Sequence, residues 1–156
     1  IDPGVASTGI AVVVERGREY VPIMYDCIRT SPDNPFPARL KALHEACRRV
    51  IRRHRPDAIA MERLFFARNA RTAMAVGQAQ GVLLLAAAGR DIEVFHYTPM
   101  EVKMAVTGDG AAGKDDVARM IQRIMGLKSL PRPDDAADAL AIAYCHLVST
   151  RRPKAP

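Results

Sequence analysis

Four acidic residues lie in stretches of sequence that are otherwise apolar. Asp2 stands in IDPG, Glu62 ends the run DAIAME, and Asp135 and Asp138 lie in DDAADALAIAYCHL. A carboxylate among buried apolar residues costs several kcal/mol unless a positive charge compensates it. No Lys or Arg is interleaved so as to compensate all four. Because Mg²⁺ and Mn²⁺ are hard cations that take oxygen ligands, the four acids predict a carboxylate-held metal site.

Asp135 and Asp138 are three residues apart on an expected helix. This spacing places their β-carbons on one face, about 5–6 Å apart, which suits two carboxylates that share or flank a cation. A pair of acids at a helix start is also common for a simpler reason, since negative charge is favourable near the positive end of the helix macrodipole. We expect Asp134 to be the N-cap. The macrodipole explains Asp138 less well, because the neighbours of Asp138 are apolar.

Glu62 and Asp2 also have simpler explanations when each is taken alone. Glu62 could be a surface residue at a strand end, and Asp2 could be an Asx-turn residue before Pro3 and Gly4. Together with the helical pair, however, they match the arrangement in which two metal ions activate a water and stabilise the leaving oxygen of a phosphodiester. The residues themselves therefore predict a metal-dependent nuclease.

Length and charge fit an enzyme that acts on a polyanion. The chain has 156 residues, and we expect one nuclease domain over 1–150 and a basic, disordered tail, RRPKAP, over 151–156. The net charge is +6 although the candidate site is acidic. A basic body around an acidic centre suits a nucleic-acid enzyme, but charge alone is equally compatible with a basic protein that binds no nucleic acid.

The cysteines and the apolar tracts indicate a cytoplasmic protein with no membrane span. Three widely spaced cysteines form no CxxC pair and are expected to be reduced core thiols: Cys27, Cys47 and Cys145. The longest apolar tract, 73–88, contains two glutamines and is shorter than the ~20 residues that a bilayer needs. Because an Asp beside a free chain end would be poorly held, we also expect residues before Ile1 that complete the first strand.

The hydrophobic pattern predicts an α/β fold. After a first strand that ends near Asp2, strands are expected at 10–15, 20–29, 58–61 and 93–97. Helices are expected from residue 37 to Pro56, over about 70–88, from Pro99, over 114–125 and from 134 to about 149. This order favours a mixed sheet with three antiparallel strands and a parallel extension, flanked by helices.

Six motifs, in order along almost the whole chain, carry a specific resemblance. They are IDPG with TGIAV, then CIRT, MERLFFARNARTAMAVGQAQGV, PMEVKMAVTGDGAAGKDDV and DDAADALAIAYCH. The set resembles the RuvC family of Holliday-junction resolvases. The resemblance implies a ribonuclease-H-like fold with a mixed five-stranded sheet and a homodimer that nicks four-way DNA junctions symmetrically in recombination and repair. It also implies two Mg²⁺ or Mn²⁺ ions per active site and a partnership with the RuvA–RuvB branch-migration complex.

The resemblance also assigns roles to individual residues. It implies that the catalytic, metal-binding acids are Asp2, Glu62, Asp135 and Asp138, and that DNA is contacted by Phe65, Lys103 and Lys114. We expect Arg68, in the basic segment after Glu62, to contact DNA as well. The third acid is not Asp in every relative. Arg63, Arg68 and Arg71 make the segment after Glu62 more basic than in some relatives, which affects the expected sequence preference and not the reaction.

Several of these residues keep a second interpretation. Lys103 and Lys114 could be ordinary surface lysines, and the arginines of 48–53 are more typical of a solvated helix face than of a DNA track. Of Phe65 and Phe66, one is expected to be buried and one free to stack on a base. Gly77 and Gly81 permit close packing onto the sheet or, alternatively, a dimer contact. No histidine is assigned as a metal ligand, although His146 could form a hydrogen bond near the site.

Two other classes of function remain open. A non-catalytic junction-binding protein would need the basic surface but not the four acids. Another ribonuclease-H-like nuclease, acting on RNA·DNA hybrids or of the YqgF type, would share the acids but not FFARNA and GQAQG together.

Overall fold

The structure is a computed structural model that describes residues 1–63 and 70–151. Its elements follow in the order β1 (Ser7–Arg16), β2 (Glu19–Arg29), α1 (Phe36–His54), β3 (Ala58–Glu62), α2 (Ala70–Ala88), β4 (Glu93–Tyr97), α3 (Pro99–Thr107), α4 (Lys114–Ile124) and α5 (Asp134–Ser149). These elements coincide with the expected ones to within a few residues. The main difference is that β1 begins at Ser7, because the small and polar residues 7–9 pair through their backbone and not through an apolar pattern.

The first two strands form an antiparallel hairpin. Ser7 lies opposite Arg29 and Glu15 lies opposite Tyr20, with a register shift between Val12 and Val13. The turn uses Gly17 at φ 65°, in the left-handed region that glycine enters without steric cost.

The second pair of strands is parallel. Ala58 of β3 lies opposite Glu93 of β4, and Glu62 lies opposite Tyr97. The described residues therefore hold four strands in two two-stranded sheets, with the expected antiparallel and parallel parts, and not the single five-stranded sheet that was expected.

A short segment, Ile1–Asp2, lies between the two pairs of strands. On one side Asp2 bridges Gly9 of β1 in antiparallel fashion, through two backbone hydrogen bonds of 3.0 Å. On the other side the Ile1 amine donates to the Ala60 carbonyl at 2.7 Å, and the Glu62 amide donates to the Ile1 carbonyl at 3.2 Å. This segment therefore links the hairpin to the parallel pair.

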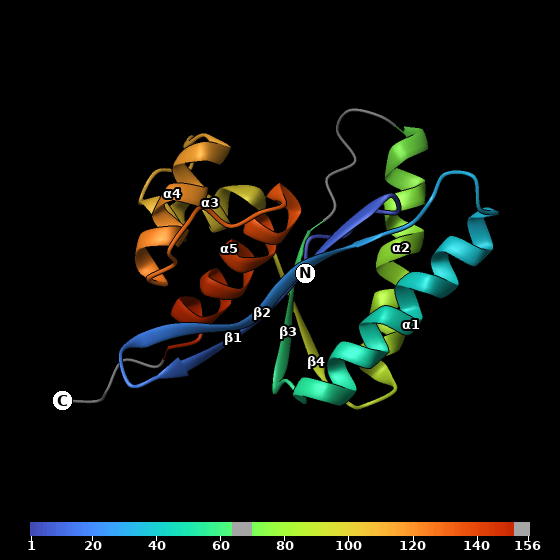
Figure 1. Cartoon of the computed structure of the whole chain (residues 1–156), viewed down its shortest axis with the longest axis horizontal. Helices are drawn as coiled ribbons and strands as arrows, with labels where there is room; N and C mark the ends of the chain where they lie inside the picture. The colour runs from blue at the N-terminus through green and yellow to red at the C-terminus, as the bar shows by residue number, and fades with distance from the viewer. Residues whose placement is uncertain (64–69, 152–156) are drawn as a thin grey trace.

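The helices cover both sides of the strands. Figure 1 shows α1 and α2 together on one side, and α5 with α3 and α4 on the other. Helix α5 packs against β1 and β2 and against α3 and α4, and α1 packs against α2. Fully buried side chains in these layers include Leu43, Met61, Leu83, Ile121 and Leu140.

The start of α5 differs from expectation. Pro133 is its N-cap and no side chain caps the helix, so Asp134 is the first helical residue and not the cap. Asp134 instead forms an ion pair with Arg132. Asp134 and Asp135 both lie in the first turn, where negative charge is favourable.

The cysteines and the chain end bear on three further expectations. All three cysteines are free; Cys47 and Cys145 are buried as expected, whereas Cys27 is only half-buried. Arg151, expected to open the tail, lies 2.8 Å from Glu15 of β1, and residues 152–156 lie outside the described residues. Among the described helices none has the length and apolar character needed to cross a bilayer.

Candidate active site

Asp2 is held by a tight turn that returns the chain to β1. Besides the two backbone bonds between Asp2 and Gly9, the buried Thr8 hydroxyl donates to the Gly4 carbonyl at 2.5 Å. A β-carbon on Gly4 would lie 2.2 Å from the Ser7 carbonyl oxygen, so only glycine fits there. These contacts explain why small and hydroxylated residues follow the acid in IDPGVASTG.

Glu62 lies beside Asp2 because of the backbone pairing at Ile1. Glu62 is the last residue of β3, and its amide donates to the carbonyl of Ile1, the residue before Asp2. The two carboxyl groups share a hydrogen bond. Both side chains are half-buried at the carboxyl end of the parallel strands, as the strand-end position of Glu62 predicted.

The start of α5 approaches β1 unusually closely. A β-carbon on Gly9 would lie 1.9 Å from the backbone carbonyl oxygen of Asp135, so this contact requires glycine. The Ser7 hydroxyl donates a hydrogen bond to Oδ2 of Asp135, and Sγ of Cys27 lies 3.7 Å from the same oxygen. Asp135 is therefore held on the β1 side of the helix.

Asp138 is paired with a lysine from another helix. Nζ of Lys114, the first residue of α4, lies 2.8 Å from Oδ2 of Asp138. This contact and the negative charges of Asp2 and Asp135 raise the pKa of Lys114, although its partial burial opposes the shift.

The acids strongly affect one another's charge. Burial, reinforced by the charge of Asp138, raises the pKa of Asp2. Burial, the charge of Asp2 and the proton that Glu62 donates to Asp2 raise the pKa of Glu62 to about 7, whereas Lys114 opposes this shift. Three carboxyl groups, Asp2, Glu62 and Asp138, are thus close enough to repel one another, and a proton on Glu62 relieves part of that repulsion.

The ligand atoms of this cluster are of the kind that a hard divalent cation binds, but the side chains are not arranged around a common binding position. All the candidate ligands are carboxylate oxygens, which Mg²⁺ and Mn²⁺ prefer. Across residues 1–63 and 70–151, no three Asp, Glu, His or Cys side chains stand ready to hold a metal ion. The contacts above account for this, since Asp2 and Glu62 bond to each other, Asp138 to Lys114 and Asp135 to Ser7.

The other residues expected at the site are not all brought to it. Lys103 is half-buried on α3 and forms no ion pair within the described part of the chain. Phe65, Phe66 and Arg68 lie outside the described residues. His146 accepts or donates a hydrogen bond with the Tyr97 hydroxyl at 2.9 Å, about two turns along α5 from Asp138.

Ser7, Thr8 and Cys27 support the acids but were not predicted as site residues, and Cys27 was predicted only to be a core thiol. Each is a common residue in a strand or turn, and only the tertiary contact with Asp135 or Gly4 gives it a place at the site. The sequence signal that could have pointed to these residues was the pair Thr8–Gly9, which follows Ser7 and begins the family motif TGIAV.

Comparison with known proteins identifies the family. The family model described as "Crossover junction endodeoxyribonuclease RuvC" matches residues 1–146. The chain belongs to the RuvC family. This confirms the resemblance seen in its motifs, and with it the activity: the enzyme is a nuclease that resolves four-way, or Holliday, DNA junctions. Members of this family are metal-dependent nucleases.

Individual relatives resemble the enzyme over nearly its whole length. A protein of Desulforamulus reducens with the same family name is 51% identical over 146 residues, covering 94% of this chain and 90% of the relative. The structure of Thermus thermophilus RuvC superimposes with a TM-score of 0.90 at 40% identity, covering 97% of this chain and 93% of the other. The same T. thermophilus protein in complex with a Holliday junction substrate matches with a TM-score of 0.89 at 38% identity, covering 97% and 92%.

Proposed function

We propose that Asp2, Glu62, Asp135 and Asp138 are the catalytic acids of this junction resolvase and that they hold Mg²⁺ or Mn²⁺, two ions per active site. The observation that carries this proposal is the gathering of Asp2, Glu62 and Asp138 in a half-buried place, where burial first and mutual repulsion second raise the pKa of Asp2 and of Glu62. Carboxylates gathered against their own repulsion are stabilised by a cation. Asp135 completes the set from the first turn of α5.

The protein's own residues position the reaction. Bound divalent ions supply Lewis acidity and a metal-activated water for phosphodiester hydrolysis. Asp2 and Glu62, fixed by the Ile1 and Gly9 backbone bonds, offer oxygens from the strand ends, whereas Asp138 and Asp135 offer them from α5. For Glu62 to act as a ligand it loses the proton it shares with Asp2, which its pKa of about 7 allows near neutral pH.

One of the proposed DNA contacts, Lys114, lies at this cluster. Lys114 already reaches the acids and can neutralise a phosphate, because phosphate contacts dominate the affinity of proteins for DNA. Lys103 and Phe65 are proposed as junction contacts from the family resemblance, with Phe65 stacking on a base near the crossover. Arg68 is proposed from its place in the basic segment after Glu62. The structure of T. thermophilus RuvC with a Holliday junction substrate supports junction DNA as the ligand.

A homodimer is proposed because a junction requires two related incisions, which two copies of one site supply by two-fold symmetry. The exposed face of α2 offers a surface for it. Met74 and Leu85 on this helix are 69% and 62% exposed, and a β-carbon on Gly81 would meet nothing within 4 Å. Apolar side chains beside an open glycine allow two helices to approach closely.

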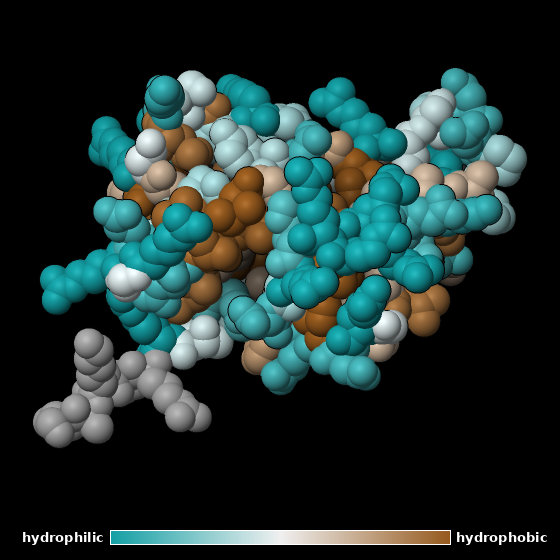
Figure 2. All heavy atoms as spheres, turned by 60° about the horizontal axis from the view of Figure 1, so that its bottom comes forward, coloured by the Kyte–Doolittle hydropathy of each residue, from teal (hydrophilic) through white to brown (hydrophobic). Residues whose placement is uncertain are grey.

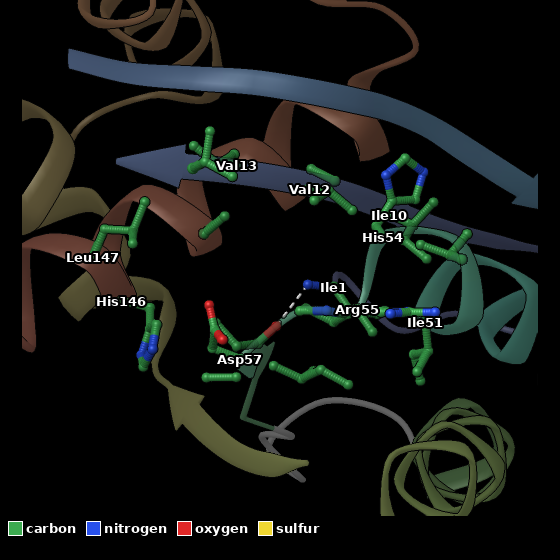
Figure 3. A pocket seen from close by; sticks show the side chains of 18 of the residues that line it. Ile1, Ile10, Val12, Val13, Ile51, His54, Arg55, Asp57, His146 and Leu147 are labelled. Carbon is green, nitrogen blue, oxygen red and sulfur yellow. Dashed lines mark hydrogen bonds between the residues drawn. The ribbon is translucent and has the colours of Figure 1, made fainter. Parts of the chain in front are cut away.

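We infer that Ile1–Asp2 is the centre of one mixed sheet, with β1 and β2 on one side of it and β3 and β4 on the other. A groove of about 220 Å³ separates β1 from β3 beyond Ile1, and its lining includes Val12, Val13, Ala58 and Ile59. Figure 3 shows these strands with α1 and α5 around the groove, and Figure 2 shows the face at the lower end of Figure 1, where hydrophobic side chains surround a hollow. Both strands turn an unpaired edge toward the groove, so an extended segment there would bond to both.

The strand proposal has a direct test. A variant that carries four or five alternating Val and Thr residues before Ile1 is expected to melt at a higher temperature and to bind less of a hydrophobic dye, because the added strand covers the groove. A control extension of Gly and Ser residues of equal length is expected to leave both properties unchanged. Equal melting temperatures for the two extended variants would refute a strand site.

The proposed setting is the bacterial recombination machinery. Junction DNA, free thiols and the family resemblance support an enzyme of the cytoplasm that works with the RuvA–RuvB branch-migration complex. Pull-down of purified RuvA–RuvB on junction DNA, with and without the enzyme, tests that partnership.

The activity is tested by comparing three substrates of matched sequence with Mg²⁺ or Mn²⁺: a four-way junction, a linear duplex and an RNA·DNA hybrid. Paired nicks are expected in the junction and little cleavage of the other two. Preferred cleavage of the hybrid would instead favour another ribonuclease-H-like nuclease, and junction binding without nicks would favour a non-catalytic binding protein.

A further inference from the structure

Lys114 is the cation that contacts the acidic cluster. Its Nζ lies 2.8 Å from Asp138, whereas the neighbouring ion pairs join Arg119 to Asp116 and Arg132 to Asp134. None of the other ion pairs in the described part of the chain includes Asp2, Glu62, Asp135 or Asp138. The charge of this one lysine is therefore placed against oxygens proposed to hold metal ions.

Little besides this ion pair holds the lysine in place. The Lys114 side chain is 76% exposed while that of Asp138 is 27% exposed, so a half-buried carboxylate is approached by a side chain that lies mostly in solvent. Lys114 is also the first residue of α4, directly after the glycine at Gly113, and its long chain can turn toward solvent without moving the helix. The carboxylate is fixed by the close packing of α5, and the ammonium can leave.

The pocket beside the pair is open to a ligand. A cavity of about 210 Å³ is lined by Lys114 and Asp138 and by residues of the loop before α5, including Pro131 and Arg132. Three cationic side chains and three acids line this space: Lys114, Arg119 and Arg132, with Asp115, Asp134 and Asp138. Both arginines are paired with other acids, Arg119 with Asp116 and Arg132 with Asp134, so Lys114 is the cation next to Asp138. A phosphate that entered this space would attract Lys114 away from Asp138, because the phosphate and the Asp138 carboxylate are anions that compete for the same ammonium group.

We propose that Lys114 exchanges between Asp138 and a DNA phosphate, and that it thereby couples junction binding to metal binding. In the free enzyme the ammonium neutralises Asp138 and excludes a divalent cation from its Oδ2. When a phosphate of the junction takes the ammonium, the carboxylate becomes available to the metal. The proposal rests on the proposed metal-binding role of the acids, and it accounts for the absence of a ready three-ligand cage among the described residues.

The first experiment measures Mn²⁺ binding without DNA, from the electron paramagnetic resonance signal of the free ion. Lys114→Met, which keeps most of the length of the side chain and removes its charge, is expected to bind Mn²⁺ about three- to tenfold more tightly than the unmodified enzyme. Lys41→Met is the matched control, because Lys41 is 75% exposed and pairs with Glu45 at 3.9 Å on α1, and it is expected to leave the affinity unchanged.

The second experiment measures the coupling. Affinity for a four-way junction is determined with Ca²⁺ and with a chelator, for the unmodified enzyme and for Lys114→Met. By thermodynamic reciprocity, the factor by which Ca²⁺ strengthens junction binding should be smaller in the variant by the same three- to tenfold. Unchanged Mn²⁺ affinity in Lys114→Met, or an unchanged coupling factor, would overturn the proposal. Lys114→Gln is a second neutral variant should Lys114→Met fold poorly.

A further variant separates this proposal from the metal site itself. Asp138→Asn is expected to weaken Mn²⁺ binding. If it does while Lys114→Met leaves Mn²⁺ binding unchanged, the metal site stands and only the exchange of Lys114 is refuted. If Asp138→Asn leaves Mn²⁺ binding unchanged, the metal-binding role of Asp138 fails, and the exchange fails with it.

Discussion

At the scale of single residues, the closeness of Asp2 and Glu62 is the clearest source of unfavourable electrostatic free energy in the site. Two carboxyl groups that share a hydrogen bond in a half-buried position cannot both be ionised without repulsion. The enzyme keeps them together because the backbone of Ile1 and Asp2 is bonded to strands on both sides. The cost is thus imposed by the fold, and a bound cation would relieve it.

This cost predicts how stability depends on pH. The pKa of Glu62 is raised to about 7 from an ordinary value of 4.5, so the folded enzyme binds this proton more tightly than the unfolded chain. The resulting stabilisation is complete below about pH 4.5 and is lost as the pH rises to about 7. For the metal-free enzyme we expect Glu62 to lower the free energy of unfolding by about 1–2 kcal/mol between pH 5 and pH 8, after allowance for solvent screening of a partly open site.

Urea unfolding at four pH values between 5 and 8 measures this effect. Glu62→Gln lacks the titrating group, so its free energy of unfolding should fall less over this range and should exceed that of the unmodified enzyme at pH 8. Parallel profiles for the two proteins would contradict the pKa assigned to Glu62.

Residue types were enough to find the acids but not their partners. Asp2, Glu62 and Asp138 were predicted because each is a charge in an apolar run, and the structure brings them together. The pairing of Lys114 with Asp138 joins residues 24 apart, on two helices, and no local pattern encodes it. The Ser7 hydroxyl at Asp135 spans 128 residues and is equally invisible to spacing arguments.

At the scale of elements, the contact between β1 and α5 sets the geometry of the site. Gly9 allows the backbone of Asp135 to lie where a β-carbon would be, 1.9 Å away. Helix boundaries and strands could be predicted from periodicity, since prolines and apolar faces mark them. The short distance between α5 and β1 could not be predicted in this way, because it depends on the absence of a side chain at Gly9.

Gly9→Ala tests this contact. The added methyl group must push the start of α5 away from β1, which should cost about 1–3 kcal/mol in the free energy of unfolding and displace Asp135 and Asp138, reducing the rate of junction nicking. The matched control is Gly89→Ala, whose β-carbon would meet its nearest neighbour at an ordinary 3.6 Å and should change stability by less than about 0.5 kcal/mol. Equal stability and nicking in the two variants would show that α5 does not depend on Gly9.

At the scale of the whole molecule, the two sides of the strands have different proposed tasks. Helix α5 carries two of the proposed catalytic acids and packs with α3 and α4, whereas α2 on the other side leaves Met74, Gly81 and Leu85 exposed, where we propose that a second copy binds. The existence of α2 could be predicted from its sequence. Whether its small residues face the sheet or solvent could not, because the helix is apolar almost all round and its periodicity is weak.

Gly81→Glu should therefore separate the dimer without harm to the fold. The new side chain has room in the single chain but introduces a charge into the proposed interface. Analytical ultracentrifugation should show monomers, and nicks in a four-way junction should become unpaired. Ala42→Glu, an exposed position on α1, is the control and should remain dimeric. A dimeric Gly81→Glu enzyme that still makes paired nicks would place the interface elsewhere.

Junction nicking by amide variants shows whether the clustered acids act through metal ions at the scissile phosphate. With Mg²⁺ or Mn²⁺, Asp2→Asn and Glu62→Gln should nick a four-way junction slower by about 10³-fold or more, because several kcal/mol of transition-state stabilisation are lost. Both should still bind the junction in a gel-shift assay, and the exposed-acid controls Asp33→Asn and Glu45→Gln should nick at the normal rate. Near-normal nicking by Asp2→Asn or Glu62→Gln would show that these acids do not hold the catalytic metal ions.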